Sequence, residues 1–176
     1  MPQIAQEVKG MIRDVVDFPK PGIVFKDITT ALKDSDTLKK MVDFLCDNFR
    51  EEKIDYIIGL ESRGFIFGVP VAYNLGAGFV PIRKPNKLPA KTISESYELE
   101  YGTDTLEMHE DAVKAGDRVL IVDDLLATGG TAAAACNLVT KAGAEIVGCA
   151  FVIELNDLKG RDKLPKGCRI LSMLEY

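Results

Sequence analysis

One stretch of the sequence decides the fold: RVLIVDDLLATGGT, residues 118–131. Residues 118–122 are mostly apolar and β-branched in a continuous run, which predicts a buried strand. Two carboxylates, Asp123 and Asp124, follow that strand directly. A small, glycine-bearing loop comes next and opens a helix predicted over 131–142. A buried strand that passes through a short loop into a helix is typical of a parallel sheet covered by helices.

The rest of the chain alternates between helical and strand-like segments. Apolar residues at helical spacing predict one helix over 36–53, and a second helix is predicted over 64–75. Residues 91–108 break the alternation, and their loosely alternating pattern predicts an antiparallel excursion. We therefore expect an α/β fold in a single domain over 1–176, with a central, mostly parallel sheet flanked by helices. The further predicted strands are 56–60, 78–82, 145–153 and 168–173.

Sheets of this kind bind their ligands beyond the carboxyl ends of the strands, here at 61–64, 83–91 and 123–131. In the last segment, backbone N–H groups of the loop and of the helix N-terminus can hold a phosphate monoester. Asp123 and Asp124 would repel a phosphate, but they can accept hydrogen bonds from vicinal hydroxyls or hold Mg²⁺. A ribose 5-phosphate meets both requirements. The alternative is a polar strand end with a simple helix cap.

Composition excludes several classes of protein. The 176 residues are 47% hydrophobic, enough for a full core, and 22 basic against 27 acidic residues give a net charge of −5. We expect no nucleic-acid partner, because phosphate neutralisation needs a basic face. The sequence contains no apolar run of about 18 residues and no signal-peptide core, so we expect no membrane segment. Four scattered cysteines without a C-x-x-C pair predict reduced thiols in a cytoplasmic protein. A single histidine excludes histidine-based zinc chemistry.

The quoted stretch resembles the 5-phosphoribosyl diphosphate (PRPP) motif of type I phosphoribosyltransferases, which is an apolar strand, two acids, two variable residues and Ala-Thr-Gly-Gly-Thr. Four further segments are similar, in the same order, to the adenine phosphoribosyltransferases of that family, and the similarity extends over about residues 5–176. These segments are 18–29, 59–68, 83–89 and 97–102.

This resemblance implies a fold and an activity. The implied fold is that of the type I phosphoribosyltransferases, with a small hood from about residues 1–34 that contributes to base binding and a flexible antiparallel loop over the active site. The implied activity is a step of purine salvage, in which the phosphoribosyl group of PRPP is transferred to adenine with Mg²⁺, giving AMP and pyrophosphate. Such enzymes are usually homodimers.

The resemblance also assigns roles to individual residues. The ribose and phosphate would be bound by Asp123, Asp124, Ala127, Thr128, Gly129, Gly130 and Thr131, with Mg²⁺ carried by PRPP near the two aspartates. The pyrophosphate would be bound by Glu61, Ser62, Arg63, Arg83, Lys84 and Lys87, with a cis peptide between the first two. Adenine would be bound by Val24, Phe25, Lys26 and Leu125. The catalytic residues would be Glu100, Arg63 and Lys84.

Some of these roles also have a physical basis in the sequence. Residues 83–91 hold four positive charges and no acid within an acidic chain. A polyanion explains such a local cluster better than a solvated charge run does. Arg63 follows a predicted strand, at an edge where a bidentate grip on diphosphate is natural. The role of Glu100, a hydrogen bond to the base, comes from the resemblance, because in the sequence it is one of three acids on a polar face.

Two other functions stay open at this point. The nearer one is the same fold acting on hypoxanthine, guanine or xanthine, because the PRPP motif does not choose the base. The other is a non-catalytic PRPP-binding regulator, which should carry a basic DNA-binding domain. We expect no such domain, because only a short segment precedes Phe18. Many members of the family carry arginine where Lys26 stands, so we expect main-chain groups to read the base there.

Overall fold

The structure, a computed structural model, describes residues 3–98 and 102–176. The chain forms two units, Met1–Phe44 and Leu45–Tyr176, and each has its own internal packing. The boundary lies within helix α3 (Ser35–Phe49). This helix ends four residues before the predicted end at 53, because Phe49 is the last apolar residue that it buries.

The second unit contains a five-stranded parallel sheet in the order β4-β3-β7-β8-β9. Its three central strands are almost entirely buried, as expected for continuous apolar runs covered on both faces. The predicted central parallel sheet and each of its five strands are confirmed. The strands are β3 (Tyr56–Leu60), β4 (Gly78–Ile82), β7 (Arg118–Leu126), β8 (Glu145–Glu154) and β9 (Ile170–Glu175).

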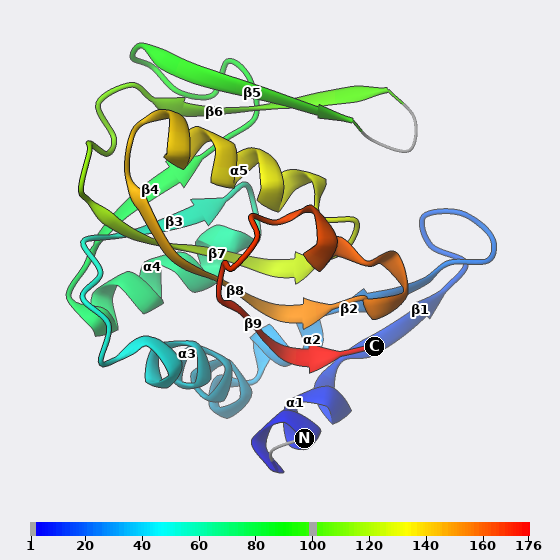
Figure 1. Cartoon of the computed structure of the whole chain (residues 1–176). Coiled ribbons are helices and arrows are strands. Elements are labelled where there is room, and N and C mark those ends of the chain that lie inside the picture. The colour runs from blue at the N-terminus through cyan, green and yellow to red at the C-terminus, as the bar shows by residue number, and fades with distance from the viewer. Residues whose placement is uncertain (1–2, 99–101) are drawn as a thin grey trace. The chain divides into compact units, whose positions relative to one another are not determined.

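The two crossover helices of this sheet, α4 (Gly64–Leu75) and α5 (Gly130–Lys141), cover opposite faces (Figure 1). The reason is the strand order: β3 leads through α4 to β4 on one side, and β7 leads through α5 to β8 on the other. Crossovers of the same right hand then place the two helices on opposite faces. The strand order therefore reverses between β3 and β7, whose carboxyl ends flank the crevice where such sheets bind ligands.

Strand β7 is longer than predicted and ends at Leu126 rather than at residue 122. It continues because β8 runs beside it, pairing Asp123 with Phe151 and Leu126 with Glu154. Asp123 and Asp124 thus lie within β7, whose pairing with β8 continues to Leu126, and the expectation that they follow its end was wrong. Their placement in the sheet fixes the main chain of both acids.

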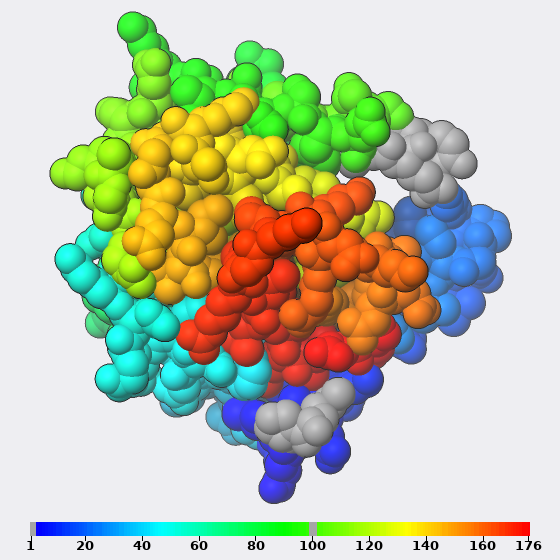
Figure 2. Space-filling view, in the orientation of Figure 1, coloured from blue at the N-terminus to red at the C-terminus, as the bar shows by residue number. Residues whose placement is uncertain are grey.

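The predicted antiparallel excursion is a hairpin of β5 (Thr92–Glu98) and β6 (Thr103–His109). The hairpin packs on α5, and Figure 2 shows its green atoms directly against the yellow atoms of that helix. Main-chain hydrogen bonds between Arg83 and Glu107 also join β6 to the chain just beyond β4. A hydrophobic core fills the space between the sheet, α5 and the hairpin.

The first unit was not predicted in detail. It contains α1 (Gln3–Met11), an antiparallel pair of β1 (Arg13–Val16) and β2 (Val24–Asp27), and α2 (Thr29–Lys33). Each strand has only four residues, too few for a clear period.

The second unit also has two short 3₁₀ turns after β8, η1 (Asn156–Leu158) and η2 (Gly160–Lys163). None of the four cysteines, all within the described residues, forms a disulfide. Within residues 3–98 and 102–176, no helix is both long enough and apolar enough to span a membrane.

Candidate active site

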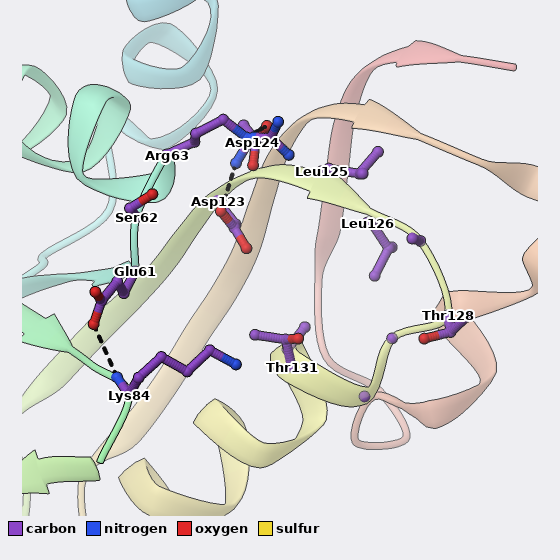
Figure 3. A pocket seen from close by; sticks show the side chains of 14 residues that line it. Glu61, Ser62, Arg63, Lys84, Asp123, Asp124, Leu125, Leu126, Thr128 and Thr131 are labelled. Atoms are coloured by element: carbon purple, nitrogen blue, oxygen red, sulfur yellow. Dashed lines mark hydrogen bonds and ion pairs between the residues drawn. The ribbon is translucent and has the colours of Figure 1, made fainter. Parts of the chain in front are cut away.

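A cavity of about 410 Å³ opens at the carboxyl ends of β3 and β7, where the strand order reverses (Figure 3). This volume suits a small-molecule ligand. Its walls come from the turn after β3, from Lys84 beyond β4, and from the end of β7 with the loop that opens α5. The lining residues are Glu61, Ser62, Arg63, Lys84, Asp123, Asp124, Leu125, Leu126, Ala127, Thr128, Gly129, Gly130, Thr131 and Ala132. The predicted ribose-phosphate segment and part of the predicted pyrophosphate segment therefore share one cavity.

The loop at 127–129 delivers the N-terminus of α5 to this cavity. Gly129 has φ +79° and ψ −2°, a left-handed conformation that suits glycine, and it turns the chain from β7 into the helix. The N–H groups of the first helical turn have no acceptor within a helix, so they and the helix dipole favour an anion. Thr131 is among the residues predicted to bind the ribose and phosphate, and its hydroxyl donates to the Tyr97 hydroxyl at 3.2 Å in this structure.

The turn after β3 lies directly against β7. A Cβ atom on Gly64 would stand 2.8 Å from the Val122 carbonyl oxygen and 2.9 Å from Asp123 Oδ1, so only glycine permits this approach. The peptide bond between Glu61 and Ser62 is cis, as the resemblance implies. This close approach brings Arg63 beside the acids of β7.

The two acids differ in their partners. Asp124 is almost fully buried, with 8% of its side chain exposed, and its Oδ2 lies 2.7 Å from Arg63 Nε. Asp123 accepts a hydrogen bond from the Asp124 N–H at 2.8 Å. Burial raises the pKa of Asp123 well above its ordinary value, and the neighbouring charge of Asp124 adds to this. Burial also raises the pKa of Asp124, although the charge of Arg63 acts against it. A cation or hydroxyl donors in the cavity would therefore stabilise the ionised pair.

Glu61 joins the ends of β3 and β4. Its carboxylate accepts hydrogen bonds from the Lys84 main-chain N–H at 2.9 Å and from Arg83 Nε at 3.2 Å. Burial acts to raise the pKa of Glu61, but these hydrogen bonds together outweigh it and leave the pKa lowered. Arg83 also donates to the Lys87 carbonyl oxygen, and neither of these two residues lines the cavity. Of the cations predicted to bind pyrophosphate, the structure thus brings Arg63 and Lys84 into the cavity.

Lys84 reaches across the cavity toward Thr131 (Figure 3) and is held by the hairpin. Its ammonium group forms an ion pair with Asp104 and lies 3.2 Å from the Tyr97 hydroxyl, which donates to the same carboxylate. Burial acts to lower the pKa of Lys84, but these partners together raise it, so the ammonium stays charged. Sequence reasoning missed Asp104, because no local pattern marks a contact across 20 residues.

The remaining predicted residues lie elsewhere in the chain. Val24, Phe25 and Lys26 belong to β2 of the first unit, where the Phe25 ring packs edge-on against Phe18 with centroids 5.2 Å apart. Glu100 lies outside the described residues.

The acids suit a metal ion that arrives with its ligand. Mg²⁺ prefers carboxylate oxygens, which Asp123 and Asp124 supply, but Arg63 already contacts an oxygen of Asp124. In the described part of the chain, no group of three or more acidic, histidine or cysteine residues could hold a metal ion. The pair therefore fits a Mg²⁺ whose other ligands come from a diphosphate.

Comparison with known proteins extends these observations. The family model of the phosphoribosyl transferase domain matches residues 29–172. The chain is 58% identical over 170 residues to the adenine phosphoribosyltransferase of Acaryochloris marina, covering 97% of this chain and 99% of the relative. The crystal structure of the adenine phosphoribosyltransferase from Thermoanaerobacter pseudethanolicus superimposes with a TM-score of 0.94 at 52% identity, covering 98% and 99% of the two chains. The Saccharomyces cerevisiae enzyme, complexed with an imino-altritol bisphosphate and adenine, gives 0.92 at 44% identity, covering 98% and 99%.

Proposed function

The chain belongs to the family of adenine phosphoribosyltransferases, and we propose that the cavity between β3 and β7 is the site of its reaction. The protein is a purine salvage enzyme that transfers the 5-phosphoribosyl group of PRPP to adenine, giving AMP and pyrophosphate. One observation carries the assignment of the site: a helix N-terminus suited to a phosphate, an acid pair suited to ribose hydroxyls, and two cations suited to a diphosphate line the same cavity.

The sugar phosphate is bound from β7 and α5. N–H groups of residues 129–131 bind the 5-phosphate, with Thr128 beside them, and the carboxylates of Asp123 and Asp124 accept hydrogen bonds from the ribose hydroxyls. The hydroxyls then replace Arg63 as partners of Asp124. The guanidinium that pairs with Asp124 at 2.7 Å in this structure is thereby released to the diphosphate.

The reaction replaces one bond at ribose C1 with another. The bond from C1 to the diphosphate oxygen breaks with its electron pair leaving on the diphosphate, and a ring nitrogen of adenine forms the new bond. Arg63 and Lys84 stabilise the charge of the leaving group, with Arg83 and Lys87 as more distant cations, while Asp123 and Asp124 lie near the positive charge that develops on the ribose. Mg²⁺ carried by PRPP would lie near Asp123 and Asp124 and would supply further positive charge there.

Adenine is read by Val24, Phe25 and Lys26 of β2 and by Leu125, with Glu100 as the carboxylate that accepts the proton of the ring nitrogen. One contact supports main-chain reading at Lys26: its Nζ lies 2.8 and 2.9 Å from the two carboxylate oxygens of Asp14. The side chain already has an ionic partner within its own unit. We propose that the N-terminal part of the chain, about residues 1–34, contributes to base recognition and that residues 1–176 form a single functional domain.

The assay for the proposed function is product formation. We expect AMP and pyrophosphate from adenine, PRPP and Mg²⁺. Formation of IMP, GMP or XMP in preference to AMP would show that the protein acts on another purine base. Tight binding of PRPP without any nucleotide product would instead indicate a regulator.

The lysines of the basic segment are expected to act on rate rather than on folding. Lys84→Ala should lower kcat/KM by roughly ten- to a hundredfold, because one charge-assisted contact to the diphosphate is lost, and Lys87→Ala should lower it less. Lys87 is exposed, and 37% of the Lys84 side chain is exposed. An ion pair exposed to this degree adds little stability, so the melting temperature of Lys84→Ala should stay within a few degrees of wild type. A collapse of thermal stability would show the cluster to be structural.

A homodimer is supported by one face of α4. Ile66, Val69 and Tyr73 share a helical face and are 42%, 51% and 87% exposed. Apolar side chains that gather on one exposed face mark a contact surface, and a second copy of the chain is the proposed occupant. Val69→Asp should therefore shift the protein from dimer to monomer in sedimentation equilibrium. Lys166→Asp, a charge change at another exposed position, is the control and should leave the dimer intact. A Val69→Asp protein that stays dimeric would reject this face.

We also propose a cytoplasmic location. Its support is that the four cysteines, all within the described residues, form no disulfide, since compartments that favour disulfides oxidise such thiols. The net charge of −5 likewise favours small-molecule partners over nucleic acid.

A further inference from the structure

The phosphate loop, residues 127–129, rests against the main chain of Gly160. A Cβ atom on Gly129 would stand 2.2 Å from the Gly160 carbonyl oxygen, and a Cβ atom on Gly160 would stand 2.3 Å from the Ala127 carbonyl oxygen. Real Cβ atoms do not approach so closely, so the two backbones touch directly. Gly129 lines the cavity and Gly160 does not, which places Gly160 behind the loop.

The residue at 160 is glycine because of this contact. Gly129 needs its positive φ for the turn into α5, but Gly160 does not have a positive φ. A residue with a side chain could therefore adopt the backbone conformation at position 160, and only the clash of its Cβ atom with the loop excludes it. The Gly160 Cβ position also lies 3.1 Å from the Gly129 nitrogen, whose N–H belongs to the proposed phosphate site.

An ion pair between a buried carboxylate, Glu154, and the partly exposed Arg161 holds Gly160 in place. Arg161, the next residue, grips Glu154 with two nitrogens: Nε lies 2.5 Å from Oε1 and Nη2 lies 2.6 Å from Oε2. Glu154 is 2% exposed, and Ser172 donates a further hydrogen bond to its Oε2. A bidentate pair fixes the orientation of the guanidinium, and a buried carboxylate without its partner would be costly. The sheet thus holds η2, which carries Gly160, at a fixed distance from the loop.

We infer that Gly160, anchored by the Glu154–Arg161 pair, is a positioning residue that sets the backbone of the phosphate loop. The inference rests on the proposed function. The loop ends in Gly129, Gly130 follows directly as the first residue of α5, and two adjacent glycines would leave this segment conformationally loose by itself. Contact with a second backbone holds its N–H groups in the direction of the phosphate before the ligand arrives, which lowers the cost of ordering the loop on binding.

The experiment compares Gly160→Ala with Lys163→Ala, an exposed residue of the same 3₁₀ turn, as matched control. We expect Gly160→Ala to weaken the binding of ribose 5-phosphate, measured by calorimetry, and to raise the KM for PRPP, each by about ten- to a hundredfold. The KM for adenine and the melting temperature should stay near wild type. Lys163→Ala should match wild type in every measurement.

A second variant tests the anchor and covers a failure of Gly160→Ala to fold. Arg161→Lys keeps the positive charge but loses the bidentate contact. It should therefore raise the KM for PRPP by less than Gly160→Ala does, and it should leave the KM for adenine unchanged. Wild-type affinity for ribose 5-phosphate in a folded Gly160→Ala protein, or in Arg161→Lys if the first does not fold, would overturn the inference. Equal increases in the KM for PRPP and in the KM for adenine would overturn it too, because they would indicate a general structural role. Ribose 5-phosphate binding does not require turnover, so a wild-type protein that made no AMP would refute the proposed function separately.

Discussion

Replacing Asp123 and Asp124 together by asparagine is expected to raise the KM for PRPP by about a hundredfold or more. Each change converts a charge-assisted hydrogen bond to a ribose hydroxyl into a neutral one, and such a bond contributes roughly 1.5–3 kcal/mol. The variant loses hydrogen-bond energy to the ribose hydroxyls and keeps the contacts to the phosphate. Binding of inorganic phosphate to the loop should therefore change little. Steady-state kinetics with PRPP as the varied substrate measure the effect.

The same variant separates function from stability. Burial raises the pKa of both acids, which means that the folded protein disfavours their charged forms. Neutral side chains of the same shape should therefore leave the melting temperature unchanged or raise it. Asp111→Asn, at an exposed position, is the control and should keep wild-type kinetics. Wild-type KM and kcat in the double variant would contradict the role of the acid pair.

Adenine is expected to be favoured over hypoxanthine by at least about 10³ in kcat/KM. The two bases differ at position 6, which is an amine or a carbonyl, and at N1, which is an acceptor or a donor. Main-chain groups near Val24 to Lys26 that match adenine at both positions would face like groups in hypoxanthine. Two buried mismatches of about 1–3 kcal/mol each give roughly 2–6 kcal/mol, which brackets this ratio.

The variant Lys26→Ala sharpens this test. It removes the ion pair with Asp14 but leaves the main chain in place, so the preference for adenine should persist even if stability falls slightly. Rates are compared at base concentrations below KM. Similar values of kcat/KM for the two bases would contradict main-chain reading, and loss of the preference in Lys26→Ala alone would assign the reading to its side chain.

The sequence predicted those parts of the molecule that depend on local pattern. Residues 118–131 carry a strand, a turn glycine and a helix start in one continuous segment, and the rule that ligands bind at carboxyl ends then located the cavity. The extension of β7 to Leu126 could not be predicted, because it depends on pairing with β8. The ion pair of Lys84 with Asp104 and the contact of Gly129 with Gly160 join residues distant in the chain. Such contacts have no local sequence pattern and can be recognised only in the folded structure.

The most direct test of the account is a crystal structure of the protein with AMP bound. We expect the 5-phosphate on the N–H groups of residues 129–131, the ribose hydroxyls on Asp123 and Asp124, and Arg63 no longer paired with Asp124. Main-chain groups of residues 24–26 should contact the amine and N1 of the base. A phosphate bound away from residues 127–131, or an Asp124 that keeps Arg63 while the ribose lies elsewhere, would contradict the account.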